Sequence, residues 1–223
     1  MDHEAAELPA GVGRPARAPG GGRARGDTRE RIQSVALELF AEHGYQQTSL
    51  REIAERLGVT KAALYYHFKS KEDIVRSFTE DYAAELDALL TWGADQPRSP
   101  ATRAALLTRY SDIVQQRLAV LRFLEQNQAA VHHLMSENGA RDNKRMFREQ
   151  FEKLRDLLAP PGCPLEERVR ASVAVVSVGL GTLLFQKEAA DPAELREIVL
   201  GIATELAAAA PAPTGHGMNA ATT

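Results

Sequence analysis

The chain has 223 residues, 44% hydrophobic and 26% charged, which is the composition of an ordinary soluble globular protein. Its length allows one large domain, or a small domain and a medium one. The net charge of −3 excludes a strongly basic protein, but residues 1–71 carry 11 basic against 9 acidic residues and the remainder carries 16 against 21. The basic excess therefore lies in residues 1–71, and a surface that binds a polyanion is expected there.

The first 26 residues are rich in Gly, Ala, Pro and Arg and have little to bury, so we expect a disordered arm. Between Pro9 and Gly26 its charges are four arginines. Such an arm is either a solubilising tail or a segment that lies along a phosphate backbone or in a minor groove. The sequence leaves both open.

An amphipathic helix is expected next, beginning at Asp27, which has capping-box spacing to Glu30, and ending near His43. Its apolar residues keep a helical period. They predict one face packed against the following helices.

Residues 48–71 read TSLREIAERLGVTKAALYYHFKSK and predict two short helices joined by a tight turn. Ser49 can cap the first helix, Gly58 ends it, and Thr60 can cap the second. Leu64 and Phe68 lie one turn apart on the inner face of the second helix. The pattern predicts a helix-turn-helix, whose second helix is the element that enters a DNA major groove.

The order of these motifs also resembles a family. A helix ending in Phe and Gly, then T-S-L-R-E-I-A, G-V-T-K-A-A-L-Y-Y-H-F and K-S-K-E, is similar to the DNA-binding domain of TetR-type transcriptional regulators. The matching stretch runs from about Thr28 to Ile74. The resemblance implies a homodimer with a small N-terminal DNA-binding domain and a larger helical domain for effector binding and dimerisation.

By motif position, the resemblance implies DNA contacts from the helix-turn-helix and from the start of the next helix. Lys61 would approach base edges, and Lys71 would contact a phosphate. For Tyr65, Tyr66 and Lys71 the alternative is packing within their own domain. The implied contact residues are Thr48, Ser49, Arg51, Thr60, Lys61, Ala62, Ala63, Tyr65, Tyr66, His67 and Lys71.

Further helices are expected along the rest of the chain, with no convincing strand, so the fold class is all-α. The first two expected helices run from Ser70 toward Trp92 and from Ser99-Pro100 through Val114. One or two short helices, interrupted near Asn127, are expected within 118–135. The last three are expected over 140–158, from Pro164 to about Glu188, and from Asp191-Pro192 through Leu206. The predicted organisation is a helix-turn-helix domain over 27–71, a helical ligand-binding and dimerisation domain over 72–210, and a flexible tail over 211–223.

Apolar and aromatic side chains of the larger domain are candidates for an effector pocket, although helical spacing alone favours ordinary core for each of them, because a stripe at that spacing does not separate a filled core from a cavity lining. The candidates are Phe78, Tyr82, Trp92, Tyr110, Phe123, Leu124, Met135, Phe147, Phe151 and Val176.

The last two helices combine apolar stripes with small residues, which allow close helix packing. They could form a four-helix interface with a second copy or be ordinary core helices of a monomer, and the resemblance favours the dimer. The candidate interface residues are Val173, Ser177, Leu180, Leu184, Leu195, Val199, Ile202 and Leu206.

No membrane segment is expected. The N-terminus lacks the apolar core of a secretion signal, and the run 171–185 is interpreted as a buried helix too short to span a bilayer. The single cysteine, Cys163, excludes an intrachain disulfide and fits a reducing cytoplasm; it is either a small loop residue or a reactive thiol.

The sequence thus predicts a cytoplasmic, homodimeric, TetR-like transcriptional regulator, in the first instance a repressor, which binds a palindromic operator and is released by a small apolar or amphipathic effector. One alternative is a DNA-binding architectural protein without an effector. Another is a helical ligand-binding or enzymatic protein whose N-terminal fold no longer binds DNA. No metal, phosphate-loop or nucleophile motif is present, so neither an enzyme nor a cofactor is expected.

Overall fold

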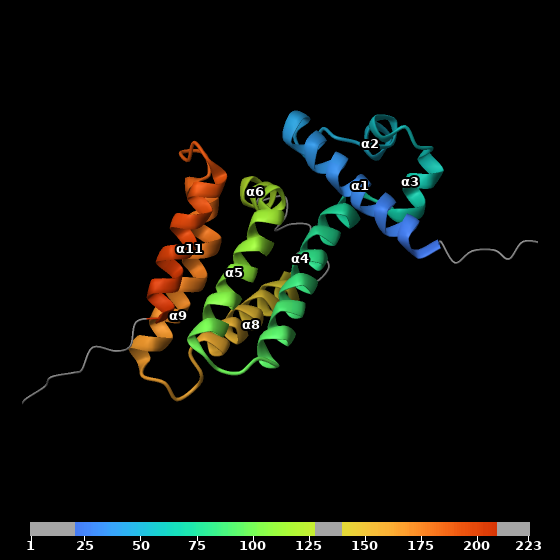
Figure 1. Cartoon of the computed structure of the whole chain (residues 1–223). Coiled ribbons are helices and arrows are strands. Elements are labelled where there is room, and N and C mark those ends of the chain that lie inside the picture. Colours follow the sequence, from blue (N-terminus) through green and yellow to red (C-terminus); the bar gives the residue numbers. More distant parts are fainter. Residues whose placement is uncertain (1–20, 128–139, 209–223) are drawn as a thin grey trace, which may run out of the picture.

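A computed structural model describes the backbone of residues 21–127 and 140–208 and the side chains of 27–127 and 145–208 (Figure 1). These parts of the chain are helical and contain no strand, as the sequence predicts. The helices are α1 (Gly21–His43), α2 (Leu50–Leu57), α3 (Lys61–His67), α4 (Lys71–Ala94), α5 (Pro100–Gln116), α6 (Leu118–Gln126), α8 (Ala140–Leu158), α9 (Leu165–Val176), the π-helical segment η1 (Ser177–Gly181), α10 (Thr182–Phe185) and α11 (Pro192–Ala208).

The N-terminal domain has its own hydrophobic core, built from α1, α2, α3 and the first turns of α4. Ile32 and Leu39 of α1, Ile53 of α2 and Leu64 of α3 are buried to 1% exposure or less. Two buried residues come from far along the chain, Val120 and Phe123 of α6, and Phe123 stacks on Phe40 with ring centroids 5.2 Å apart. The N-terminal core is therefore closed by the larger domain.

The larger domain packs α4, α5, α8, α9 and α11 around a second core. The long helix α4 belongs to both cores, since Phe78 near its start lies in the first and Leu89 near its end lies in the second. Figure 1 shows α4 running from the N-terminal domain into the body, with α8 crossing behind it. Helix α4 is thus the direct covalent and packing link between the two domains.

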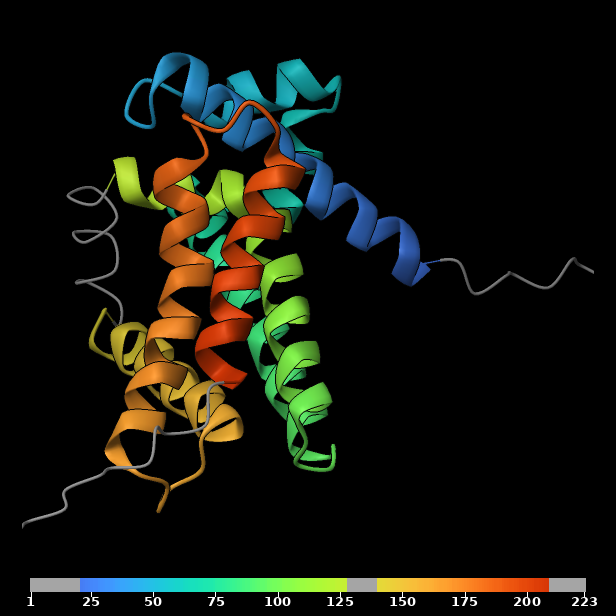
Figure 2. The same cartoon turned by 60° about the vertical axis from the view of Figure 1, so that its left-hand side comes forward.

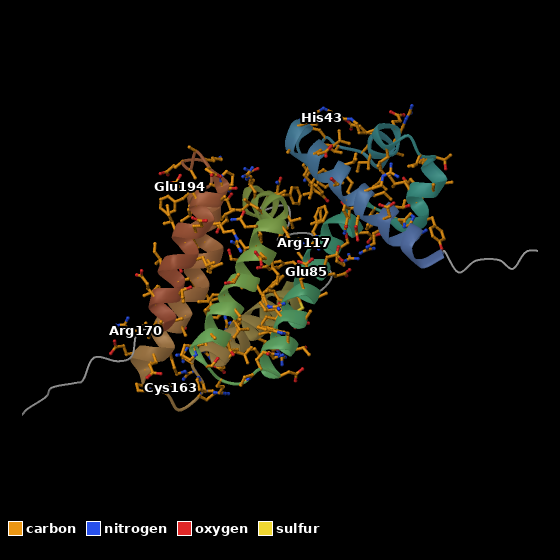
Figure 3. All side chains as sticks on the ribbon, viewed as in Figure 1. His43, Glu85, Arg117, Cys163, Arg170 and Glu194 are labelled. Atoms are coloured by element: carbon orange, nitrogen blue, oxygen red, sulfur yellow. The ribbon has the colours of Figure 1, made fainter. Side chains whose placement is uncertain are left out.

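An ion pair reinforces this link where α5 meets α6. Arg117 Nε donates to both carboxylate oxygens of Glu85 on α4 at 3.1 Å. Both residues are labelled in Figure 3, between α4 and the base of α6. A second polar contact joins Arg122 of α6 to Gln186, just after α10. The short helix α6 is therefore tied to α4 at its start and to the segment after α10, while its apolar face enters the N-terminal core.

The chain from Leu165 to Phe185 is one continuous helix of 21 residues that passes through the π-helical segment. By length and composition alone this helix could cross a membrane, because it is longer than the run 171–185 on which the sequence-based expectation was based. The expectation of a buried helix was wrong, because 28% of its apolar window is buried. It packs against α5, α8 and α11 on one side only, and Figure 2 shows it beside α11 at the front of the molecule.

The sequence misplaced the beginning of the first helix. Helix α1 begins at Gly21, six residues before the predicted Asp27, so residues 21–26 are helical and not part of the arm. Asp27 lies inside this helix, and its predicted role as a cap was wrong. Arg23, Ala24 and Arg25 are good helix formers, which favours the extension. The predicted tail beyond 208 and the arm before 21 lie outside the described residues.

Candidate nucleic-acid interface

Helices α2 and α3 are held at fixed ends by local hydrogen bonds. The Ser49 hydroxyl accepts from the backbone N–H of Glu52 at 3.2 Å, and the Thr60 hydroxyl accepts from that of Ala63 at 3.1 Å. Gly58 between them has φ 68°, a left-handed conformation that favours glycine. The predicted caps and turn are confirmed, and the sequence of the loop itself sets the angle between the two helices.

Helix α3 has one face in the core and one face in solvent. Leu64, in the middle of the helix, is 0% exposed and Phe68, its C-cap, is 2% exposed, so the inner face is anchored at its middle and at its C-terminal end. On the outer face Lys61, Ala62 and Ala63 are exposed, and Tyr66 is 62% exposed. This is the face that the sequence assigns to DNA.

The aromatic residues of α3 are arranged beside its charges. The Lys61 ammonium lies 5.4 Å from the centroid of the Tyr65 ring, which is half-buried. The Tyr66 and His67 rings meet edge to face at 5.3 Å. Tyr65 therefore packs partly within its own domain, as the alternative interpretation held, while Tyr66 presents its ring to solvent.

Lys71, the implied phosphate contact, is engaged within the domain. Its Nζ donates to the backbone carbonyls of Tyr45 at 2.7 Å and Gln46 at 3.1 Å, and it lies over the Tyr45 ring. Partial burial lowers the pKa of the Lys71 ammonium. Its contact with DNA stays a prediction, and its visible role is to tie the loop before α2 to the start of α4.

Two other implied contacts also have local partners. Thr48 is 1% exposed and its hydroxyl donates to the carbonyls of Leu39 and Gly44, so its side chain is not available to DNA and that prediction was wrong. Arg51 is exposed and pairs with Glu55 at 2.7 Å along α2. Its guanidinium stays at the surface, where this exposed ion pair is weak and can be exchanged for a phosphate.

Lys69 was not among the predicted contacts, although it lies in the quoted K-S-K motif. It is exposed just beyond α3, and its Nζ donates to the carbonyl of Tyr65 at 2.6 Å. The ammonium therefore sits at the C-terminal end of α3, where it is exposed. Counting every lysine of the motif would have found it.

A cavity of about 190 Å³ lies in the larger domain, between α4, α5, α8 and α9. Four predicted pocket residues line it: Tyr82, Tyr110, Phe147 and Phe151. The remaining lining residues are Leu86, Leu89, Leu90, Gln150, Leu154 and Val175. Sequence reasoning missed Gln150 because a single glutamine on a charged helix carries no periodic signal.

Other predicted pocket residues lie elsewhere. Phe78 is buried in the N-terminal core because the first turns of α4 belong to it, and Phe123 is buried there and Leu124 packs against it because α6 inserts there. Val176 is 46% exposed on the outside of α9, where its neighbour Val175 faces inward. Trp92 packs against the second core without lining the cavity, under the Arg109 guanidinium. Met135 lies outside the described residues.

The continuous helix from Leu165 to Phe185 carries a line of exposed apolar residues at successive spacings of three or four, which we call the apolar stripe. Its members are Leu165, Val169, Val173, Val176, Leu180 and Leu184. Ile198 and Ile202 of α11 are also about half exposed. Between the two helices, a groove of about 610 Å³ is lined by residues that include Phe185 and Ile198.

The predicted interface residues divide by exposure. Those that are exposed, as an interface with a second copy requires, are Val173, Leu180, Leu184 and Ile202. Ser177 is half-buried and lines the groove. Leu195 and Val199 are buried at 8% and 7% exposure within the protomer's own core, so these two predictions were wrong. Leu206 is half-buried against that core, and its place in an interface stays a prediction. On α11 the exposed Ile198, one turn before Ile202, was missed.

Comparison with known proteins matches the helix-turn-helix first. A family model described as "Bacterial regulatory proteins, tetR family" matches residues 32–78. The HTH-type transcriptional regulator AcrR of Shigella flexneri is 42% identical over 77 residues, 33% of this chain and 35% of that protein. The HTH-type transcriptional repressor KstR2 of Rhodococcus jostii is 37% identical over 84 residues, 36% of this chain and 40% of that protein. The chain thus spans less than half the length of these relatives.

Solved structures resemble most of the chain. The TetR family transcriptional regulator PfmR from Thermus thermophilus superposes with a TM-score of 0.63 at 19% identity, covering 79% of this chain and 96% of that one. The ketosteroid transcriptional regulator KstR2 of Mycobacterium tuberculosis gives 0.59 at 19% identity, covering 81% and 93%. At such identities the likeness shows a shared fold, with a helix-turn-helix domain followed by a helical domain.

Proposed function

Since this chain belongs to the tetR family of bacterial regulatory proteins, we propose that it is a cytoplasmic transcriptional regulator, in the first instance a repressor, that binds duplex DNA as a homodimer. The observation that carries the proposal is the two-sided helix α3. Leu64 and Phe68 fix its inner face in the core while Lys61, Ala62 and Tyr66 stand in solvent. A rigidly held helix with an open, small and basic outer face suits the major groove.

Contacts to phosphates would flank this helix. Lys69 at its C-terminal end supplies a positive charge, and the N-terminus of α4 begins at Lys71, where backbone N–H groups favour an anion. Ala62 and Ala63 allow close approach to base edges, and a methyl group there suits thymine. Phosphate contacts fix the register on the duplex, and the α3 face reads the bases.

A second copy would cover the apolar stripe. Exposed apolar surface of this length is unusual on a monomer and marks an interface. A twofold dimer through the stripe and Ile198 and Ile202 of α11 presents two α3 helices related by symmetry. The matching operator is therefore a palindrome with half-sites about one helical turn apart.

Effector control would act through α4, which begins at Lys71 and supplies Tyr82, Leu86 and Leu89 to the cavity wall. A small apolar or amphipathic molecule in the cavity would favour a position of α4 in which the two α3 helices no longer match the operator. To move a two-state equilibrium from 1:99 to 99:1 the effector must prefer that form by about 5.5 kcal/mol.

The proposal is tested by selecting bound duplexes from a randomised DNA library at near-physiological salt. We expect an inverted repeat to be enriched by the wild-type chain, and Tyr66→Ala to bind it more weakly with the fold intact. Ala88→Arg, at an exposed position of α4, is the matched surface control. Uniform binding without an enriched repeat would contradict the proposal and favour an architectural protein.

A further inference from the structure

The cavity between α4, α5, α8 and α9 contains one polar side chain whose bonding is incomplete. Gln150 of α8 is 3% exposed, and its Oε1 is a buried acceptor without a hydrogen-bond partner among the described residues. Its Nε2 donates to the carbonyl of Ala83 at 2.8 Å and to Asp87 Oδ1 at 2.9 Å, both on α4.

These two bonds also fix which way the amide points. Ala83 O and the Asp87 carboxylate are both acceptors, so reversing the amide would place Oε1 against them and lose both bonds. Oε1 is therefore held on the side away from α4's backbone. A buried amide oxygen is normally satisfied by a donor, and within the described part of the chain no group donates to this one.

The rest of the described lining is apolar and aromatic, with no charged side chain. Tyr82 and Phe147 face each other with ring centroids 5.9 Å apart. Burial raises the pKa of Tyr82 and of Tyr110, so both phenols are neutral throughout the physiological range. An ionised ligand would find no counter-charge on these walls, and such burial is strongly unfavourable.

The volume of the cavity further limits which ligands it can hold. An apolar cavity of about 150 Å³ is large enough for one benzene ring, and this cavity measures about 190 Å³. Aromatic walls favour a flat aromatic guest through edge and offset contacts. A long acyl chain or a multi-ring skeleton is larger than the space that the described residues enclose.

We propose that the cavity binds a neutral, single-ring aromatic molecule that donates one hydrogen bond to Gln150 Oε1, as a phenol does. This inference rests on the proposed function only for the role of that molecule as an effector. The binding itself depends on the volume, the aromatic walls and the orphan acceptor.

The test compares phenol with anisole by isothermal titration calorimetry on the full chain. The two probes share a ring, but the methyl ether of anisole cannot donate. We expect the wild-type chain to bind phenol about tenfold more tightly than anisole, because an unpaired buried acceptor is costly. Benzoate, which carries a charge, should not bind measurably.

In Gln150→Met the apolar bulk is kept and the acceptor is removed, so the preference for phenol should vanish. Gln116→Met, the same change at an exposed position of α5, should keep it. Equal affinities of phenol and anisole for the wild-type chain, no binding of either, or an unchanged preference in folded Gln150→Met would each overturn the inference.

Operator release is measured separately, by fluorescence anisotropy of the selected duplex with and without phenol. Preferential phenol binding that leaves DNA affinity unchanged would uphold the ligand class and reject this molecule's part in effector control. If the wild-type chain showed no preference for phenol but released the operator in response to another compound, effector control would be upheld and the proposed ligand class would be rejected.

Discussion

Two faces of this molecule stand open to solvent, and they differ in chemistry. The outer face of α3 presents Lys61 and Tyr66, groups that combine charge or a polar tip with a hydrocarbon body. The apolar stripe presents valines and leucines along most of the length of a helix. The first face is suited to a wet, charged partner, and the second is suited to an apolar surface of the same kind.

This contrast teaches that exposure alone does not identify a binding site. What distinguishes the faces is what lies beneath them. Helix α3 is short and depends on Leu64 and Phe68 for its position, whereas the stripe belongs to a helix that packs against α5, α8 and α11 along its other side. Mutations on the two faces should therefore separate assembly, folding and DNA affinity.

The largest effect should come from a charge in the stripe. Leu180→Arg would place a guanidinium in the apolar interface, where an uncompensated charge costs about 3 kcal/mol or more, so self-association should weaken at least about a hundredfold. Analytical ultracentrifugation should show a monomer. Ala88→Arg should leave the dimer intact, and a dimeric Leu180→Arg would reject the stripe as the interface.

A change beneath α3 should be nearly as damaging, but to folding. Leu64 is fully buried, and Leu64→Ala should lower the free energy of unfolding of the N-terminal domain by about 3 kcal/mol. Hydrogen exchange of α2 and α3 measures this. Lys61→Ala, on the outer face of the same helix, should change stability by less than about 0.5 kcal/mol; similar losses in both variants would refute the two-sided description of α3.

A change on the outer face should affect DNA binding alone. Tyr66→Ala should weaken operator binding by about 1 kcal/mol, on the order of fivefold, through a lost polar contact. The thermal midpoint and the dimer should not change. Anisotropy titration measures the loss, and an unchanged affinity would remove Tyr66 from the interface.

The smallest effect is expected from a phosphate contact. Lys69→Ala should weaken binding to all duplexes alike and reduce the slope of log Kobs against log salt by about one. Lys187→Ala, at an exposed position just after α10, serves as the control. A slope equal to that of the control would show that Lys69 does not reach the backbone.

Local chemistry made the helix-turn-helix predictable from sequence. Ser49 and Thr60 cap helices that begin at the next residue, and Gly58 forms the turn that ends α2. All three have the roles that the sequence predicts. The buried faces of α2 and α3 follow from helical spacing alone. The all-α class and the helix that begins at Pro100 were predictable for the same reason.

The larger domain was less predictable, because the burial of its side chains depends on residues that are distant in the sequence. Phe123 has the spacing of a pocket residue, yet α6 inserts it against Phe40. On α11, Val199 is buried whereas the adjacent Ile198 is exposed. Helical periodicity alone does not show which of the two faces the core, because that depends on the helices packed against α11. Gln150 has no sequence signal, since its role depends on where α4 places Ala83 and Asp87.

The central claim is that α3 meets DNA while the stripe meets a second copy. Sedimentation of the chain with the selected, fluorescently labelled duplex tests both at once. The account predicts two protomers on each duplex for the wild-type chain, a dimer that needs about fivefold more protein to saturate the duplex for Tyr66→Ala, and a weakly binding monomer for Leu180→Arg. A monomeric Leu180→Arg that bound the duplex as tightly as the wild type would contradict it.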